Sequence, residues 1–136
     1  MAFPIVKRNK YGNTKIIVEG IKFDSKLEAY LYKILKQEGM DFDFQVVITL
    51  IPKFRFQYEN IRALAMRVDF LLRYNGKDIY IDTKGFATAE SKLKYKFLKY
   101  KFKDEPNVNI VWLKTQKEVN SYISKLKEET TELTLF

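Results

Sequence analysis

Hydrophobic and polar residues alternate most regularly between Phe42 and Leu50, where every second residue is apolar. This period of two predicts a half-buried β-strand. Two further apolar stretches, 66–73 and 78–84, flank Tyr74-Asn75-Gly76-Lys77-Asp78, which predicts a hairpin turn. The sequence therefore predicts an antiparallel pair of strands that follows the first strand.

Shorter β-rich stretches lie near both ends of the chain. Thr14–Val18 and Ile21–Phe23 are separated by Glu19-Gly20, a pattern typical of a tight hairpin. Val108–Leu113 is an apolar run that follows a turn signal, so it predicts one more strand.

Three segments carry helical patterns. The first spans about 25–38, with Ser25 as cap, an apolar stripe, and Gly39 where it stops. The second follows Thr88 and runs to about Lys103, and the third opens at a second capping-box pattern and runs to about Lys127. For the second helix, helical spacing predicts that three apolar residues face the core: Leu93, Phe97 and Tyr100.

These elements predict an α/β fold with a mixed central β-sheet flanked by helices and preceded by an N-terminal β-hairpin. With 136 residues, the chain is expected to form a single domain over 1–136. Residues 1–13 are expected to be a basic N-terminal arm, and residues 128–136 a C-terminal tail or short edge strand.

Composition narrows the chemistry. The chain has no cysteine and no histidine, which excludes disulfides, zinc–thiolate sites, a thiol nucleophile and the commonest general base. No stretch approaches the roughly 18 apolar residues of a membrane span, and no secretory signal opens the chain. We therefore expect a cytoplasmic protein, whose catalysis would use carboxylates, lysine, tyrosine or a hard metal.

The net charge is +8 and is unevenly distributed. Seven lysines and one acid lie between Lys84 and Lys103. Four of the lysines recur at helical spacing on one face of the second helix: Lys92, Lys96, Lys99 and Lys103. This ridge favours a polyanion partner such as DNA, and the alternative is a solvated helix face.

Two acids and a lysine meet at the end of the central strands. In a strand, Asp82 and Lys84 project from one side with Thr83 opposite, and antiparallel pairing brings Asp69 near Asp82. Carboxylate oxygens suit magnesium, and a neighbouring ammonium can orient the attacking water. The alternative is a surface ion pair between Asp82 and Lys84, but an unpaired acid between Val68 and Phe70 on a central strand would be costly.

Glu28 has two interpretations. Ser25 and Glu28 match a capping box, in which the glutamate only reaches back to the Ser25 backbone amide. The other interpretation places Glu28 over the strand ends as a third acid of the metal site. Spacing alone favours the capping role, and the two roles can coexist.

The order of these residues resembles the PD-(D/E)XK nuclease superfamily. Within it, the chain is similar to small phage endonucleases related to Holliday junction resolvases, on the blocks Gly20–Glu28, Val68-Asp69-Phe70 and Ile81-Asp82-Thr83-Lys84-Gly85. The sequence departs from the superfamily's motif where Val68 replaces the proline. The resemblance implies a restriction-endonuclease-like αβββαβ core in which Asp69 and Asp82 bind Mg²⁺, with Mn²⁺ as a substitute. Lys84 would position the water, and Glu28 would contribute directly or through water.

The expected function is therefore a magnesium-dependent DNA endonuclease, with a Holliday-junction-resolvase-like, structure-specific activity as its narrower form. Two nearly symmetric incisions by a resolvase would favour a homodimer. The alternatives are a non-catalytic DNA-binding module with the nuclease fold, and an interaction protein with an incidental basic face. The last alternative leaves the buried acids unexplained.

Overall fold

The computed structural model describes residues 5–8, 14–83 and 87–135. The chain groups into two compact units, Asp41–Trp112 and a second one that combines Met1–Met40 with Leu113–Phe136. No helix of the described part is long and apolar enough to cross a membrane. The α/β fold predicted from the sequence is confirmed, with a mixed four-stranded sheet, three helices and an N-terminal antiparallel hairpin.

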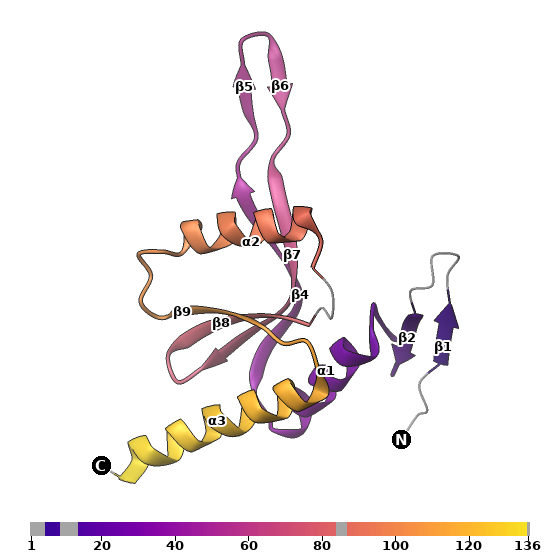
Figure 1. Cartoon of the computed structure of the whole chain (residues 1–136), viewed down its shortest axis with the longest axis vertical. Coiled ribbons are helices and arrows are strands. Elements are labelled where there is room, and N and C mark those ends of the chain that lie inside the picture. The colour runs from indigo at the N-terminus through magenta and orange to yellow at the C-terminus, as the bar shows by residue number, and fades with distance from the viewer. Residues whose placement is uncertain (1–4, 9–13, 84–86, 136) are drawn as a thin grey trace. The chain divides into compact units, whose positions relative to one another are not determined.

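The four-stranded sheet belongs to the unit Asp41–Trp112 (Figure 1). Its strands lie in the order β4 (Asp41–Ile51), β7 (Leu64–Tyr74), β8 (Lys77–Asp82) and β9 (Val108–Trp112). The first three pair antiparallel, whereas β9 runs parallel to β8. A parallel neighbour needs a long crossover, and α2 (Ala89–Lys101) lies within that connection.

The β7–β8 turn confirms the predicted hairpin. Asn75 and Gly76 both have positive φ, 51° and 74°, which is the backbone that a two-residue turn of the favoured hand requires. A second, smaller hairpin joins β4 to β7, made of β5 (Phe54–Phe56) and β6 (Glu59–Ile61), and it extends beyond the sheet in Figure 1.

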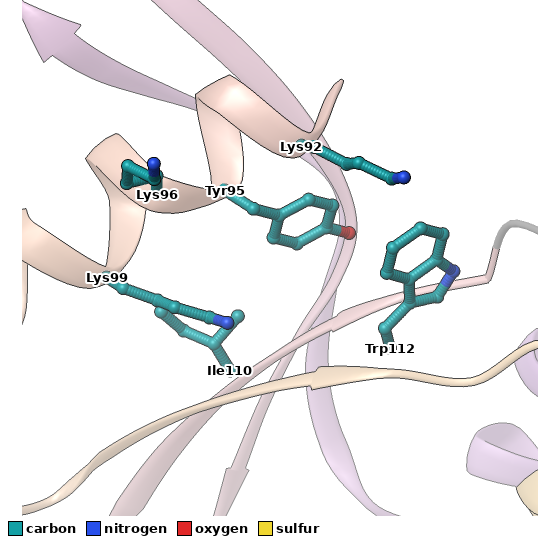
Figure 2. A pocket seen from close by; sticks show the side chains of 6 residues that line it. All are labelled: Lys92, Tyr95, Lys96, Lys99, Ile110 and Trp112. Atoms are coloured by element: carbon teal, nitrogen blue, oxygen red, sulfur yellow. The ribbon is translucent and has the colours of Figure 1, made fainter. Parts of the chain in front are cut away.

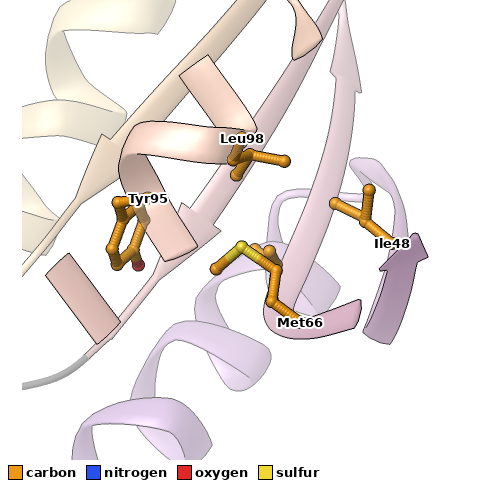
Figure 3. Close-up of a cluster of buried hydrophobic side chains, with 5 residues drawn as sticks. Ile48, Met66, Tyr95 and Leu98 are labelled. Carbon is orange, nitrogen blue, oxygen red and sulfur yellow. The ribbon is translucent and has the colours of Figure 1, made fainter. Parts of the chain in front are cut away.

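Helix α2 packs on the sheet through a cluster of buried side chains (Figure 3). Tyr95 and Leu98 from the helix meet Ile48, Met66 and Val68 from β4 and β7. Two of the three side chains predicted to face the core do not, because Leu93 is 53% exposed and Tyr100 is 70% exposed. Phe97 is half-buried.

The other unit holds a three-stranded antiparallel sheet, β1 (Ile5–Arg8), β2 (Thr14–Val18) and β3 (Ile21–Phe23), with two helices, α1 (Lys26–Gln37) and α3 (Gln116–Leu135). Helix α1 packs on β2, β3 and α3. The hairpin and the first helix are confirmed, and Ser25 is the N-cap as expected.

Two expectations for this unit were wrong. Within the arm expected over 1–13, Ile5–Arg8 form β1 and pair with β2 as a third strand beside the hairpin, because the β-branched Ile5 and Val6 favour a strand. Residues 1–4 and 9–13 lie outside the described part. The tail expected from residue 128 is instead helical to Leu135, because neither glycine nor proline follows Lys127 to end the helix.

Candidate functional site

The two central aspartates lie opposite one another on neighbouring strands, as the sequence predicted, with Asp69 in the middle of β7 and Asp82 at the end of β8. Asp82 is the last residue of β8. The β7–β8 register pairs Phe70 with Ile81, which places Asp69 opposite Asp82 at the next position. Both side chains are buried, Asp82 completely. Carboxylates removed from water in this way need hydrogen-bond donors or a cation.

Thr83 supplies two donors to Asp69. Its backbone N–H and its hydroxyl both donate to Asp69 Oδ2, at 2.9 and 2.8 Å. The prediction that Thr83 points away from the acids was wrong, because β8 ends at Asp82 and strand alternation does not continue to Thr83. These two bonds fix the orientation of the Asp69 carboxylate.

Tyr95 of α2 supplies a donor to Asp82. Its buried hydroxyl donates to Asp82 Oδ2. Burial raises the pKa of Tyr95 well above its ordinary value, and the charge of Asp82, the hydrogen bond to Asp82 and the charge of Asp69 raise it further. The Tyr95 hydroxyl therefore keeps its proton and remains a hydrogen-bond donor. Its pKa depends on the charges of both carboxylates, Asp69 and Asp82.

A polar pocket of about 280 Å³ opens beside Asp69. Helix α2 begins at this pocket, where Thr88 and Ser91 form a reciprocal capping box with bonds of 3.0 and 2.9 Å. Lys94 lies in the same pocket and pairs with Glu90 at 3.2 Å. The side chains that line this pocket, called here the Asp69 pocket, are Met66, Arg67, Asp69, Thr88, Glu90, Ser91 and Lys94.

A second pocket lies between α2 and β9 and has a volume of about 490 Å³ (Figure 2). It is called here the lysine pocket and is lined by Lys92, Tyr95, Lys96, Lys99, Ile110 and Trp112. Three of the four predicted DNA-binding lysines thus converge on one hollow. Lys103 follows the C-cap of α2 and instead contacts Asp104 at 2.8 Å. Tyr95 lines this pocket and also holds Asp82, so it joins the two features.

Glu28 caps α1. Its backbone N–H donates to Ser25 Oγ at 3.1 Å, and its Oε2 accepts from the Asp24 N–H at 2.8 Å. The glutamate therefore reaches back one residue further than the Ser25 amide that the capping box predicted. Glu28 is buried and belongs to the unit with α1 and α3, whereas Asp69 and Asp82 belong to the other unit. Its role as a third acid stays a prediction, and Lys84 lies outside the described residues.

The donor set of the two aspartates fits a hard cation, because carboxylate oxygens are the ligands that magnesium prefers. Within residues 5–8, 14–83 and 87–135, however, no group of three or more acidic side chains is gathered so that it could hold a metal ion. Any metal at Asp69 and Asp82 would therefore complete its coordination with water, with phosphate oxygens or with a further residue. The magnesium site stays a prediction.

The sequence missed Thr83, Tyr95 and the cations of the Asp69 pocket. The burial of Tyr95 could have been predicted from its helical spacing to Leu98 and Phe102. This spacing places Tyr95 and Leu98 on one face of α2, in line with Phe102 at its C-cap. Arg67 offered a weaker signal, since it lies two residues before Asp69 on the same strand.

A comparison with protein families matches residues 8–120 to the family described as "Protein of unknown function (DUF1064)". No curated protein matches the chain. The matched range contains both aspartates, Glu28, and every residue of the Asp69 pocket and of the lysine pocket. The chain therefore belongs to the DUF1064 family.

Proposed function

We propose that this protein is a magnesium-dependent DNA endonuclease that hydrolyses phosphodiester bonds. The observation that carries the proposal is the pair of buried carboxylates, Asp69 and Asp82, held opposite one another on adjacent strands. Burying two acids side by side costs free energy, and a functional site is a common reason for accepting that cost. The resemblance to PD-(D/E)XK nucleases, with magnesium on these aspartates, supports the same assignment.

Each residue has a specific task in this proposal. Asp69 and Asp82 would hold the metal, which when bound would offset the negative charge on the phosphate and lower the pKa of a water molecule. Thr83 and Tyr95 keep the two carboxylates in fixed orientations through their hydrogen bonds. They are positioning residues, since they act through the aspartates.

Cations near the acids would bind the substrate. Arg67 and Lys94 lie in the pocket that contains Asp69, and the N-terminus of α2 opens there. A guanidinium, an ammonium and a helix N-terminus all attract a phosphate group. By the resemblance, Lys84 would orient the attacking water and Glu28 would add a third acidic group.

The finer parts of the proposal are a branched substrate of the Holliday-junction type, a homodimer that makes paired incisions, and action in the cytoplasm. They rest on the resemblance. One alternative function is a non-catalytic DNA-binding module. It is favoured by the fact that both aspartates accept hydrogen bonds from their own chain, from Thr83 and Tyr95, which gives them a structural role without any metal.

A cleavage assay separates these two functions. Purified protein is incubated with linear, flap, splayed and four-way DNA in Mg²⁺, Mn²⁺, Ca²⁺ or excess EDTA. An all-oxygen site should cleave with Mg²⁺ or Mn²⁺, bind DNA with little cleavage in Ca²⁺, and be inactive in EDTA. Binding without cleavage of any substrate in either Mg²⁺ or Mn²⁺ would favour the non-catalytic module. Full cleavage activity in excess EDTA would show that the reaction does not require a metal ion.

A further inference from the structure

The lysine pocket combines three features in one hollow: a cationic wall, an aromatic surface and an aliphatic surface (Figure 2). Lys92, Lys96 and Lys99 come from α2, while Ile110 and Trp112 come from β9. Its volume of about 490 Å³ lies within the range of about 300–1,000 Å³ that is typical of sites for small organic ligands. The pocket is thus large enough for one planar group of a ligand together with the charged groups next to it in that ligand.

The aromatic surface is rigid. The rings of Tyr95 and Trp112 stack with centroids 5.4 Å apart and planes 10° from parallel. Tyr95 is held in turn by its hydrogen bond to Asp82, so the indole of Trp112 rests on a fixed support. Trp112 is only half-buried and lines the pocket. A planar ligand could stack on it without reordering the pocket, which lowers the entropic cost of binding.

The three lysines of the cationic wall have no acidic partner in the described part of the chain. Glu90 pairs with Lys94, and Asp104 pairs with Lys103, both outside this pocket. Within the described part of the chain, Lys92, Lys96 and Lys99 form no ion pair with an acid, and no acid lines the pocket. Three like charges around an aromatic surface repel one another unless an anion lies between them.

We infer that the lysine pocket binds a single unpaired nucleotide of DNA, with its base on Trp112 and its flanking phosphates on the three lysines. Stacking on an aromatic side chain accepts any base, and lysines that follow the backbone supply the charge. A base within a duplex is stacked on its neighbours and cannot enter. The inference rests on the proposed action on DNA and narrows its substrate to strands with unpaired nucleotides, such as those of branched DNA.

Trp112 itself reports the binding, because it is the single tryptophan of the chain. A base stacked on an indole quenches its fluorescence. The full-length protein is titrated in EDTA with a thymidine strand of about 12 nucleotides, within the usual site sizes for single strands. A fully abasic strand of equal length and a blunt duplex serve as controls.

We expect strong, saturable quenching by the thymidine strand and little quenching by either control, although both controls carry the same kind of phosphate backbone. Equal quenching by the abasic strand would overturn the inference, because the lysines would then bind phosphates alone. No quenching by the thymidine strand at saturation would overturn it as well. Neither outcome depends on cleavage, because EDTA removes the metal.

A variant tests the same contact by fluorescence anisotropy of labelled DNA. Trp112→Ala should weaken binding of the thymidine strand about 5- to 150-fold, the range for loss of one base–aromatic stack. The matched control is Tyr100→Ala, which removes an exposed aromatic ring from α2 outside the pocket and should leave affinity unchanged. If a folded Trp112→Ala protein binds as tightly as Tyr100→Ala, the inference fails.

The two proposals fail in different ways. Cleavage in Mg²⁺ together with base-independent quenching would contradict the unpaired-nucleotide site and leave the endonuclease intact. Base-dependent quenching without cleavage of any substrate in Mg²⁺ would contradict the endonuclease and leave the nucleotide site intact.

Discussion

Tyr95→Phe tests the contact that joins the acids to the lysine pocket. The change keeps the ring, and with it the stacking on Trp112, but it removes the hydroxyl that donates to Asp82. Asp82 is fully buried, so no solvent replaces the lost donor. A hydrogen bond to a charged group contributes about 1.5–3 kcal/mol net. For a chain of this size, roughly 3–5 °C per kcal/mol predicts a midpoint lowered by about 5–15 °C.

The assay is urea and thermal unfolding followed by circular dichroism at pH 7. Tyr100→Phe is the matched control, because it removes the hydroxyl of a 70% exposed tyrosine on the same helix. The control should unfold with the wild type. If Tyr95→Phe is as stable as Tyr100→Phe, the Tyr95–Asp82 bond contributes nothing, and the account of how Asp82 is held would be refuted.

Three further predictions concern charge and protonation. Glu28→Gln should keep the capping bonds and most of the stability but lower cleavage, whereas near-normal activity in the folded variant would make Glu28 purely structural. Replacing Lys96 and Lys99 together by glutamine should reduce the salt dependence of duplex binding by about one to two units of log–log slope, while the exposed Lys101→Gln on the same helix serves as control for non-specific charge loss. Burial and the neighbouring aspartates raise the pKa of Tyr95. The folded protein therefore retains the Tyr95 proton at a pH near 10, where the unfolded chain releases it. The wild type should therefore lose stability relative to Tyr95→Phe between about pH 9 and 11, and a constant difference in urea midpoints would contradict this assignment.

Short-range sequence patterns predicted most of the fold. Alternation marked β4, an apolar run marked β7, and Asn75-Gly76 located the turn that sets the register of Asp69 and Asp82. The Ser25 cap located the start of α1. These signals are short-range, so they can be read without knowing what each element packs against.

The buried face of α2 could not be predicted from short-range patterns in the same way. Its sequence alternates lysines with apolar residues on every side, so several faces have similar hydrophobicity. Leu93 and Tyr100 were expected inside, but Tyr95 and Leu98 occupy the core. Tyr95 gains a buried acceptor in Asp82, an interaction between residues of separate elements that helical periodicity does not include.

In the candidate site, too, short-range patterns predicted some features, and tertiary packing determines the others. The pairing of the two aspartates followed from one hairpin, and the convergence of Lys92, Lys96 and Lys99 followed from helical spacing. The donors to the aspartates depend on where β8 ends and on how α2 rotates, and tertiary packing sets both. Trp112 packs against the buried cluster on the sheet and also lines the lysine pocket, and its place in the pocket depends on the same tertiary packing.

The most direct measurement compares DNA cleavage in Mg²⁺ by the wild type, Asp69→Asn, Asp82→Asn and Asp78→Asn. Asp78 lies on the same strand as Asp82 but is exposed, so its variant removes one carboxylate without touching the site. We expect Asp69→Asn and Asp82→Asn to lose cleavage while they bind DNA as tightly as the wild type or more tightly, because a metal ligand is lost and repulsion toward phosphate falls. Asp78→Asn should cleave normally. Wild-type turnover by either a folded Asp69→Asn or a folded Asp82→Asn protein would contradict the account.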